Sequence, residues 1–178
     1  MKYFLIFILL ILSNFIHAQE SAFYRFSAKT IEGDEFDFST LSGKKVLVVN
    51  TATKCALAPQ FNKLQELYEE YGGDDFEIIG FPCNDFGKRE PDENAVISEY
   101  CQKKYGITFQ MMEKITISGE DAHPLYQWLT DSKKNGTLDA KVTWNFQKFM
   151  VDENGEVVDF VPPLGSPENK KILNWLNE

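Results

Sequence analysis

The first half of the chain carries two kinds of hydrophobic pattern, one with a period of two and one helical. Residues 23–38 alternate apolar and polar positions around a Glu-Gly-Asp turn at 32–34, which predicts a β-hairpin. The apolar runs at 45–50 and 76–81 predict strands that are covered on both faces. Between them, residues 59–71 place leucine and tyrosine at helical spacing and stop at two glycines. This strand, helix and strand with short joints predict a right-handed parallel crossover.

The second half carries helical spacing first and a hairpin later. The pattern predicts a helix over 93–104 that ends near Gly106, a short strand over 115–117, a helix from Pro124, a hairpin of 146–151 and 157–161, and a final helix over 167–176. A βαβ half followed by a ββα half is the thioredoxin-like layout. We therefore expect one α/β domain with a central mixed sheet, flanking helices and an N-terminal β-hairpin.

Residues 1–18 form a segment of their own. They begin with a positive charge, continue with an apolar run at 3–12 and end at the small residue Ala18, which is the pattern of a secretory signal peptide. A membrane-spanning helix would need roughly 20 apolar residues, so an uncleaved anchor is the less favoured alternative. We expect residues 19–178 to be exported as one domain, periplasmic or secreted, without stable insertion in a membrane.

Charge and histidine content exclude several classes of protein. The formal net charge is −9, it would be −10 without residues 1–18, and lysine and arginine form no cluster. Nucleic acid is therefore not expected as a partner. Only His123 of the two histidines would remain after cleavage, which excludes most metal sites and hydrolase triads. We expect neither a metal nor a bound cofactor.

Cys55 is the candidate for chemistry because it lies between a predicted buried strand and the start of a predicted helix. Backbone amides at a helix N-terminus, with Lys54 alongside, would stabilise a thiolate at this position. A thiolate attacks a peroxide, cleaves the O–O bond and becomes a sulfenic acid. The alternative is an inert cysteine in the core.

Two other redox motifs do not match the surroundings of Cys55. A thioredoxin-type dithiol needs a second cysteine three residues later, where the chain has Ala58. A peroxiredoxin motif would place proline seven residues and threonine or serine three residues before the cysteine, where Val48 and Ala52 stand. Both motifs are therefore disfavoured.

Four stretches resemble signatures of the glutathione peroxidase family, in the family's order: 49–55 (VNTATKC), 81–84 (FPCN), 119–126 (GEDAHPLY) and 144–149 (WNFQKF). The resemblance covers essentially all of the chain after the predicted signal peptide. It implies a thioredoxin-like fold and a thiol-dependent peroxidase of the oxidative stress response. Such an enzyme reduces hydrogen peroxide and organic or lipid hydroperoxides through a cysteine sulfenic acid, and Cys55 stands where some members carry selenocysteine.

The resemblance also assigns candidate catalytic residues. Trp144 and Asn145 match the family's tryptophan and asparagine, whose N–H groups can stabilise a thiolate and orient a peroxide oxygen. Arg89 stands at the position of the family's catalytic glutamine, and a guanidinium cannot accept a proton. We hypothesise that Arg89 stabilises the thiolate while water or Asp85 handles the proton.

The other two cysteines receive different predictions. Cys101 lies in the predicted helix with Val96 and Ile97, on a face that the spacing turns toward the core. By resemblance Cys101 is a resolving cysteine, which condenses with the sulfenic acid and is then reduced. A purely structural role is the alternative for Cys101. Cys83, at the end of a predicted strand, is expected to be structural.

The resemblance leaves the partners partly open. Glutathione or a thioredoxin-like protein would serve as the thiol reductant, as a co-substrate and not as a bound group. The short stretch between Trp128 and Trp144 resembles the monomeric members that act on lipid hydroperoxides. An exported thiol–disulfide carrier that uses Cys55 and Cys101 is a second hypothesis, and a non-catalytic thioredoxin-like binding module is a third.

Overall fold

A five-stranded mixed sheet forms the centre of the computed structural model, which describes residues 21–178; the predicted signal peptide, 1–18, lies outside them. The strands follow the spatial order β5-β4-β3-β6-β7. Their bounds are Gln110–Met111 for β5, Phe76–Pro82 for β4, Lys45–Thr51 for β3, Lys148–Val151 for β6 and Val157–Val161 for β7. β3, β4 and β5 are parallel, whereas β6 is antiparallel to both β3 and β7. The predicted α/β fold with a mixed sheet is confirmed.

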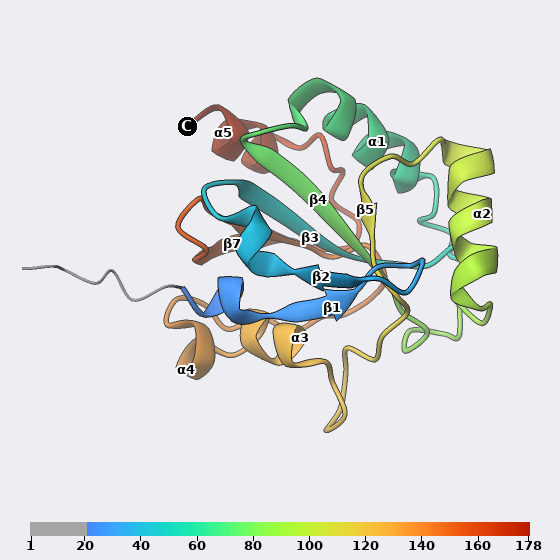
Figure 1. The fold of residues 1–178 in the computed structure, drawn as a ribbon, viewed down its shortest axis with the longest axis horizontal. Helices are drawn as coiled ribbons and strands as arrows, with labels where there is room; N and C mark the ends of the chain where they lie inside the picture. Colours follow the sequence, from blue (N-terminus) through green and yellow to red (C-terminus); the bar gives the residue numbers. More distant parts are fainter. Residues whose placement is uncertain (1–20) are drawn as a thin grey trace, which may run out of the picture.

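Helices cover both faces of this sheet (Figure 1). One face carries α1 (Gln60–Tyr71) and α5 (Lys170–Asn177), which lie above the sheet in the figure. The other face carries α3 (Pro124–Leu129), α4 (Ser132–Asn135) and the antiparallel hairpin of β1 (Ser27–Lys29) and β2 (Glu35–Asp37). α2 (Asn94–Tyr105) stands at the side of the molecule. Within residues 21–178, no helix is long and apolar enough to cross a membrane.

The central strand β3 is buried along almost its whole length and divides its side chains between two cores. Leu47 and Val49 pack in the core under α1, together with Phe61. Val46 and Val48 point to the opposite core, under the hairpin and α3. Because successive residues of a strand face opposite sides, a continuous apolar run is what a strand in this position requires.

Three loops meet at one edge of the sheet. The parallel strands β3 and β4 end together there, since Thr51 pairs with Pro82. The antiparallel strand β6 begins at the same edge, where Lys148 pairs with Val49. The loop after β3, the loop after β4 and the loop before β6 are therefore brought together, although they are far apart in the sequence.

Two sequence predictions about elements are wrong. The short strand expected at 115–117 does not form, and the edge strand is instead β5, which pairs with Ile79 and Gly80 of β4. The amides of the predicted segment have other acceptors, as described for Asp85 below. The last helix begins at Lys170 and not near Pro167, because the side chain of Asn169 caps it by accepting from two backbone amides.

The start of the hairpin and the buried face of α2 also differ from prediction. Residues 22–25 form a 3-10 helix before the hairpin, and so the hairpin strands are shorter than the alternation suggests. On α2, Ile97 and Cys101 are buried, whereas Val96 is exposed by 51% and does not belong to the core face. A residue next to a buried one on a helix is turned by about 100° from it, which accounts for the difference.

Candidate active site

Cys55 lies in the turn between β3 and α1 and is exposed by only 7%. Its Sγ accepts a hydrogen bond from the backbone N–H of Leu57 at 3.4 Å. The turn is closed by two backbone bonds, from the N–H of Cys55 to Ala52 (3.4 Å) and from Ala58 to the carbonyl of Cys55 (3.0 Å). The turn therefore places one backbone N–H donor at the sulfur of Cys55.

The structure corrects the two sources of stabilisation that the sequence suggested for Cys55. Helix α1 begins at Gln60, so a full turn of chain separates Cys55 from the helix N-terminus. Lys54 does not serve the sulfur alone, because its Nζ forms an ion pair with Asp92 at 2.7 Å. The sequence therefore located the turn, but it did not show that Lys54 pairs with Asp92 in the loop after β4.

Trp144 and Asn145 lie in the loop before β6, against the loop after β4. The Asn145 side chain is buried, and its Nδ2 donates to the carbonyl of Phe86 at 3.4 Å. Its Oδ1 is buried without a partner among the described residues. Trp144 is exposed by 38%, and its ring centroid lies 6.1 Å from that of Phe86. The structure thus places one buried amide and one accessible indole side by side.

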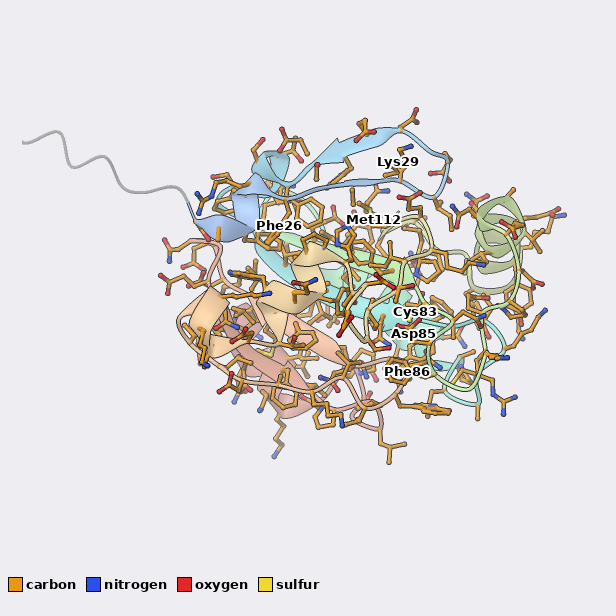
Figure 2. All side chains as sticks on the ribbon, turned by 90° about the horizontal axis from the view of Figure 1, so that it is seen from below. Phe26, Lys29, Cys83, Asp85, Phe86 and Met112 are labelled. Atoms are coloured by element: carbon orange, nitrogen blue, oxygen red, sulfur yellow. The ribbon has the colours of Figure 1, made fainter. Side chains whose placement is uncertain are left out.

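Arg89 is exposed and lies close to the same tryptophan. Between them is Gly87, at which a Cβ atom would lie 2.9 Å from the Trp144 ring and 3.5 Å from Nε of Arg89. Gly87 also has a φ of +66°, which side chains rarely adopt. A glycine is required here for both reasons. Figure 2 shows this loop leaving the sheet, with Asp85 and Phe86 following Cys83.

Asn50 ties the tryptophan loop to the strand that leads to Cys55. Its Nδ2 donates to the carbonyl of Trp144 at 3.2 Å, and its Oδ1 accepts from the N–H of Gln147 at 3.1 Å. Its own carbonyl accepts from Phe146 at 2.7 Å. Sequence reasoning did not single out Asn50, because an asparagine at the end of a strand carries no signal of a long-range contact.

Thr53 and Glu90 join the Cys55 turn to the loop after β4. Glu90 is fully buried, and its carboxylate accepts from the N–H and from the hydroxyl of Thr53, both at 2.6 Å. The N–H of Lys54 adds a bond to the carbonyl of Arg89 at 3.1 Å. Glu90 was not predicted as a site residue, and the only local signal is its place beside Arg89.

The carboxylate of Asp85 binds the segment at 117–118. Its Oδ2 accepts from the N–H of Ile117 at 2.8 Å and from the N–H and hydroxyl of Ser118, both at 2.9 Å. These three bonds hold the segment that was predicted as a strand. The hypothesis that Asp85 handles the proton of the peroxide is therefore not supported by its geometry.

The two remaining cysteines are deeply buried. Burial raises the pKa of the Cys101 thiol to about 12, and the nearby charge of Glu90 acts in the same direction. Burial also raises the pKa of Cys83 to about 12. Cys101 lines a hollow of about 340 Å³ between α2 and β5. All three cysteines of the chain are free thiols.

The described residues contain no group of three or more metal-ligating side chains. His123 has a structural contact, since its Nδ1 accepts from the N–H of Leu125 at 3.3 Å and caps α3. Burial lowers the pKa of His123, which is consistent with a neutral acceptor.

A thioredoxin-like sheet with a cysteine in the turn after its central strand defines a class of thiol-based redox proteins. Comparison with known proteins agrees with this class and narrows it. The family model "Glutathione peroxidase" matches residues 23–130. A glutathione peroxidase of Lactococcus lactis is 47% identical over 156 residues, which is 85% of this chain and 99% of that protein. The glutathione peroxidase-like peroxiredoxin GPX5 of Chlamydomonas reinhardtii is 43% identical, over 85% of this chain and 96% of that protein.

Solved structures give the same result. The crystal structure of Trgpx in apo form has a TM-score of 0.67 and 35% identity, and it covers 88% of this chain and 95% of its own. A thiol:disulfide interchange protein of Chlorobium tepidum has a TM-score of 0.60 at 20% identity, covering 89% of this chain and 94% of its own, and shares the fold alone. The chain belongs to the glutathione peroxidase family, as its motifs predicted, and it is a thiol-dependent peroxidase.

Proposed function

We propose that Cys55 is the residue that attacks the peroxide. Its thiolate would attack one peroxide oxygen, an S–O bond would form as the O–O bond breaks, and the leaving oxygen would take a proton and depart as water or alcohol. The single observation that carries this assignment is the contrast among the three cysteines. Cys55 lies in the turn after β3 and keeps 7% exposure, with the N–H of Leu57 at its sulfur, whereas Cys83 and Cys101 are 0% and 1% exposed and burial raises the pKa of both to about 12.

Trp144, Asn145 and Arg89 would stabilise the charge on sulfur and on the leaving oxygen. The indole and amide groups can donate hydrogen bonds, and the guanidinium supplies a fixed positive charge. Because Asp85 is occupied by Ile117 and Ser118, we assign the transfer of the proton to water.

Cys101 would resolve the sulfenic acid. Its sulfur would attack the sulfur of Cys55, an S–S bond would form, and the hydroxyl would leave with the proton of Cys101 as water. A dithiol reductant, such as a thioredoxin-like protein, or two molecules of glutathione would then reduce the disulfide to two thiols. Cys101 lines a hollow between α2 and β5, and its sulfur would reach Cys55 through an opening of α2.

Stopped-flow oxidation by hydrogen peroxide tests the assignment of Cys55. We expect fast oxidation of the reduced protein, monitored by tryptophan fluorescence or by the loss of thiols. This fast phase should be absent in Cys55→Ser. Cys83→Ser is the matched control, because it removes a buried thiol on the far side of the sheet and should retain the rate. If the wild-type protein reacts no faster than an ordinary thiol, the carrier and binding-module hypotheses would regain support.

Export is a separate part of the proposal. The pattern of residues 1–18 supports cleavage near Ala18 and delivery to the periplasm or the outside without stable membrane insertion. The short stretch between Trp128 and Trp144 supports a monomer. Fractionation of cells that express the whole chain, with the N-terminus determined by mass spectrometry, tests this. A chain that keeps its N-terminal segment in the cytoplasm would contradict it, and light scattering of the purified protein gives the oligomeric state.

A further inference from the structure

Glu90 is a buried carboxylate that the proposed chemistry does not use. It is 0% exposed, and none of the ion pairs found within residues 21–178 includes it. Burial raises the pKa of Glu90, while the two hydrogen bonds from Thr53 lower it. A buried carboxylate that forms no ion pair is costly, and an apolar side chain would pack at lower cost. Its presence therefore indicates a requirement other than stability.

The geometry around Glu90 indicates what that requirement is. Its two carboxylate oxygens each accept from Thr53, at 2.6 Å, a distance typical of short, charge-assisted hydrogen bonds. Its own N–H donates to Oδ1 of Asn84 at 2.9 Å, which fixes the carboxylate in its loop. Thr53 lies two residues before Cys55, at the start of the turn that Ala52 closes. Glu90 thus holds the backbone from which the Cys55 sulfur projects.

We propose that Glu90 is a positioning residue for the peroxidase reaction, which acts through Thr53 by fixing the turn that presents Cys55 to the peroxide. The proposal rests on the proposed role of Cys55. Asn84 and Glu90 belong to the loop that also carries Phe86 and Gly87 against Trp144, so one loop contacts both the turn that carries the sulfur and the indole. Reactions of this kind are sensitive to misplacement of the attacking atom by about 1 Å.

The test compares the rate of Cys55 oxidation by hydrogen peroxide among four variants. Glu90→Ala removes both acceptors, and we expect a rate that is lower by about tenfold to a hundredfold, as for a misplaced attacking atom. Glu90→Gln can still accept from the Thr53 N–H and donate to its hydroxyl, so it should stay within about threefold of wild type. Thr53→Val should lower the rate, and Thr53→Ser, which restores the hydroxyl, should recover it.

The double variant decides between positioning and a general loss of stability. If Glu90 acts through Thr53, Thr53→Val combined with Glu90→Ala should be no slower than Glu90→Ala alone, because the two changes remove the same contact. Three outcomes would overturn the proposal: additive effects of the two substitutions, a rate within twofold of wild type in Glu90→Ala, or a rate in Glu90→Gln as low as in Glu90→Ala. If Glu90→Ala does not fold, the Thr53→Val and Thr53→Ser pair decides it alone. A wild-type protein that oxidises no faster than Cys55→Ser would overturn the proposed function as well.

Discussion

By the resemblance of its motif, Arg89 stands where the family carries its catalytic glutamine. Its side chain is exposed beside Gly87 and Trp144, so its charge lies at the rim of the site and in contact with water. A glutamine at this position would donate and accept hydrogen bonds, whereas arginine can only donate and remains charged. The replacement therefore exchanges a neutral polar group for a fixed positive charge.

We expect Arg89→Gln to lower the rate of Cys55 oxidation by about threefold to tenfold, because a partly exposed charge contributes about 1 kcal/mol. The measurement is the second-order rate constant with hydrogen peroxide at two salt concentrations. The difference from wild type should shrink at higher salt, since screening weakens the charge. A large gain in rate would mean that the arginine impairs a glutamine-based mechanism.

The three cysteines should differ sharply in alkylation of the native protein. At pH 8 a thiol with a pKa of about 12 is ionised in about one molecule in ten thousand, which applies to Cys83 and Cys101. Iodoacetamide should therefore label Cys55 first and leave the other two unmodified until the protein unfolds. Peptide mass spectrometry of native and urea-denatured samples gives the pattern. Early labelling of Cys101 would show that α2 already opens in the reduced protein.

At the scale of elements, Lys148 joins β6 to α1 and to the loop between β7 and α5. It is fully buried at the start of β6, and its Nζ donates to the side-chain carbonyl of Gln60 in α1 and to the carbonyls of Gly165 (2.5 Å) and Pro163 (3.4 Å). Burial lowers the pKa of Lys148 to about 7. Three oxygen acceptors favour the ammonium, which has three hydrogens to donate, and so oppose that shift.

Lys148→Met should lower the free energy of unfolding by about 1–3 kcal/mol, because the partly buried oxygens of Gln60 and Gly165 lose their donor. Urea unfolding at pH 7 measures the change. Lys171→Met is the matched control, since Lys171 forms an exposed ion pair with Asp159 and exposed pairs contribute about 0–1 kcal/mol. An equal effect of the two substitutions would indicate that the buried contacts add nothing.

The elements that could be predicted are those whose pattern is local. The apolar runs gave β3 and β4, and helical spacing with a glycine stop gave α1 and α2 to within a residue or two. The strand expected at 115–117 failed because Asp85, some thirty residues earlier, takes the amides of Ile117 and Ser118. Such a contact leaves no trace in the spacing of apolar residues.

At the scale of the whole molecule, we expect the proposed disulfide to require movement of α2. Cys101 lies inside α2 with 1% exposure, whereas Cys55 lies in a turn of another element, and both are free thiols. A disulfide needs its two Cα atoms at about 4.4–6.8 Å with specific dihedral angles. The carbonyl of Cys101 also accepts the bonds that end the helix near Gly106. Formation of the disulfide should therefore disturb the end of α2.

After oxidation with one equivalent of peroxide, we expect backbone amides of α2 to exchange with deuterium at least about tenfold faster, while β3, β4 and β6 keep their protection. Hydrogen-exchange mass spectrometry measures this, and Cys101→Ser, oxidised in the same way, should show no such change. A non-reducing digest should contain a linked Cys55–Cys101 peptide. Absence of that peptide would rule out Cys101 as the resolving cysteine.

The sequence by itself determined the thioredoxin-like order of elements, the family, and Cys55 as the candidate for chemistry. These rest on local order: the period of apolar residues and short motifs around single positions. Only the tertiary structure decided that Lys54 pairs with Asp92, that Asp85 is occupied, and that Glu90 holds Thr53. The physical reason is that parallel strands end at one edge of a sheet, so that loops distant in the sequence meet there. The contacts between these loops are set by tertiary packing and not by neighbours in the chain.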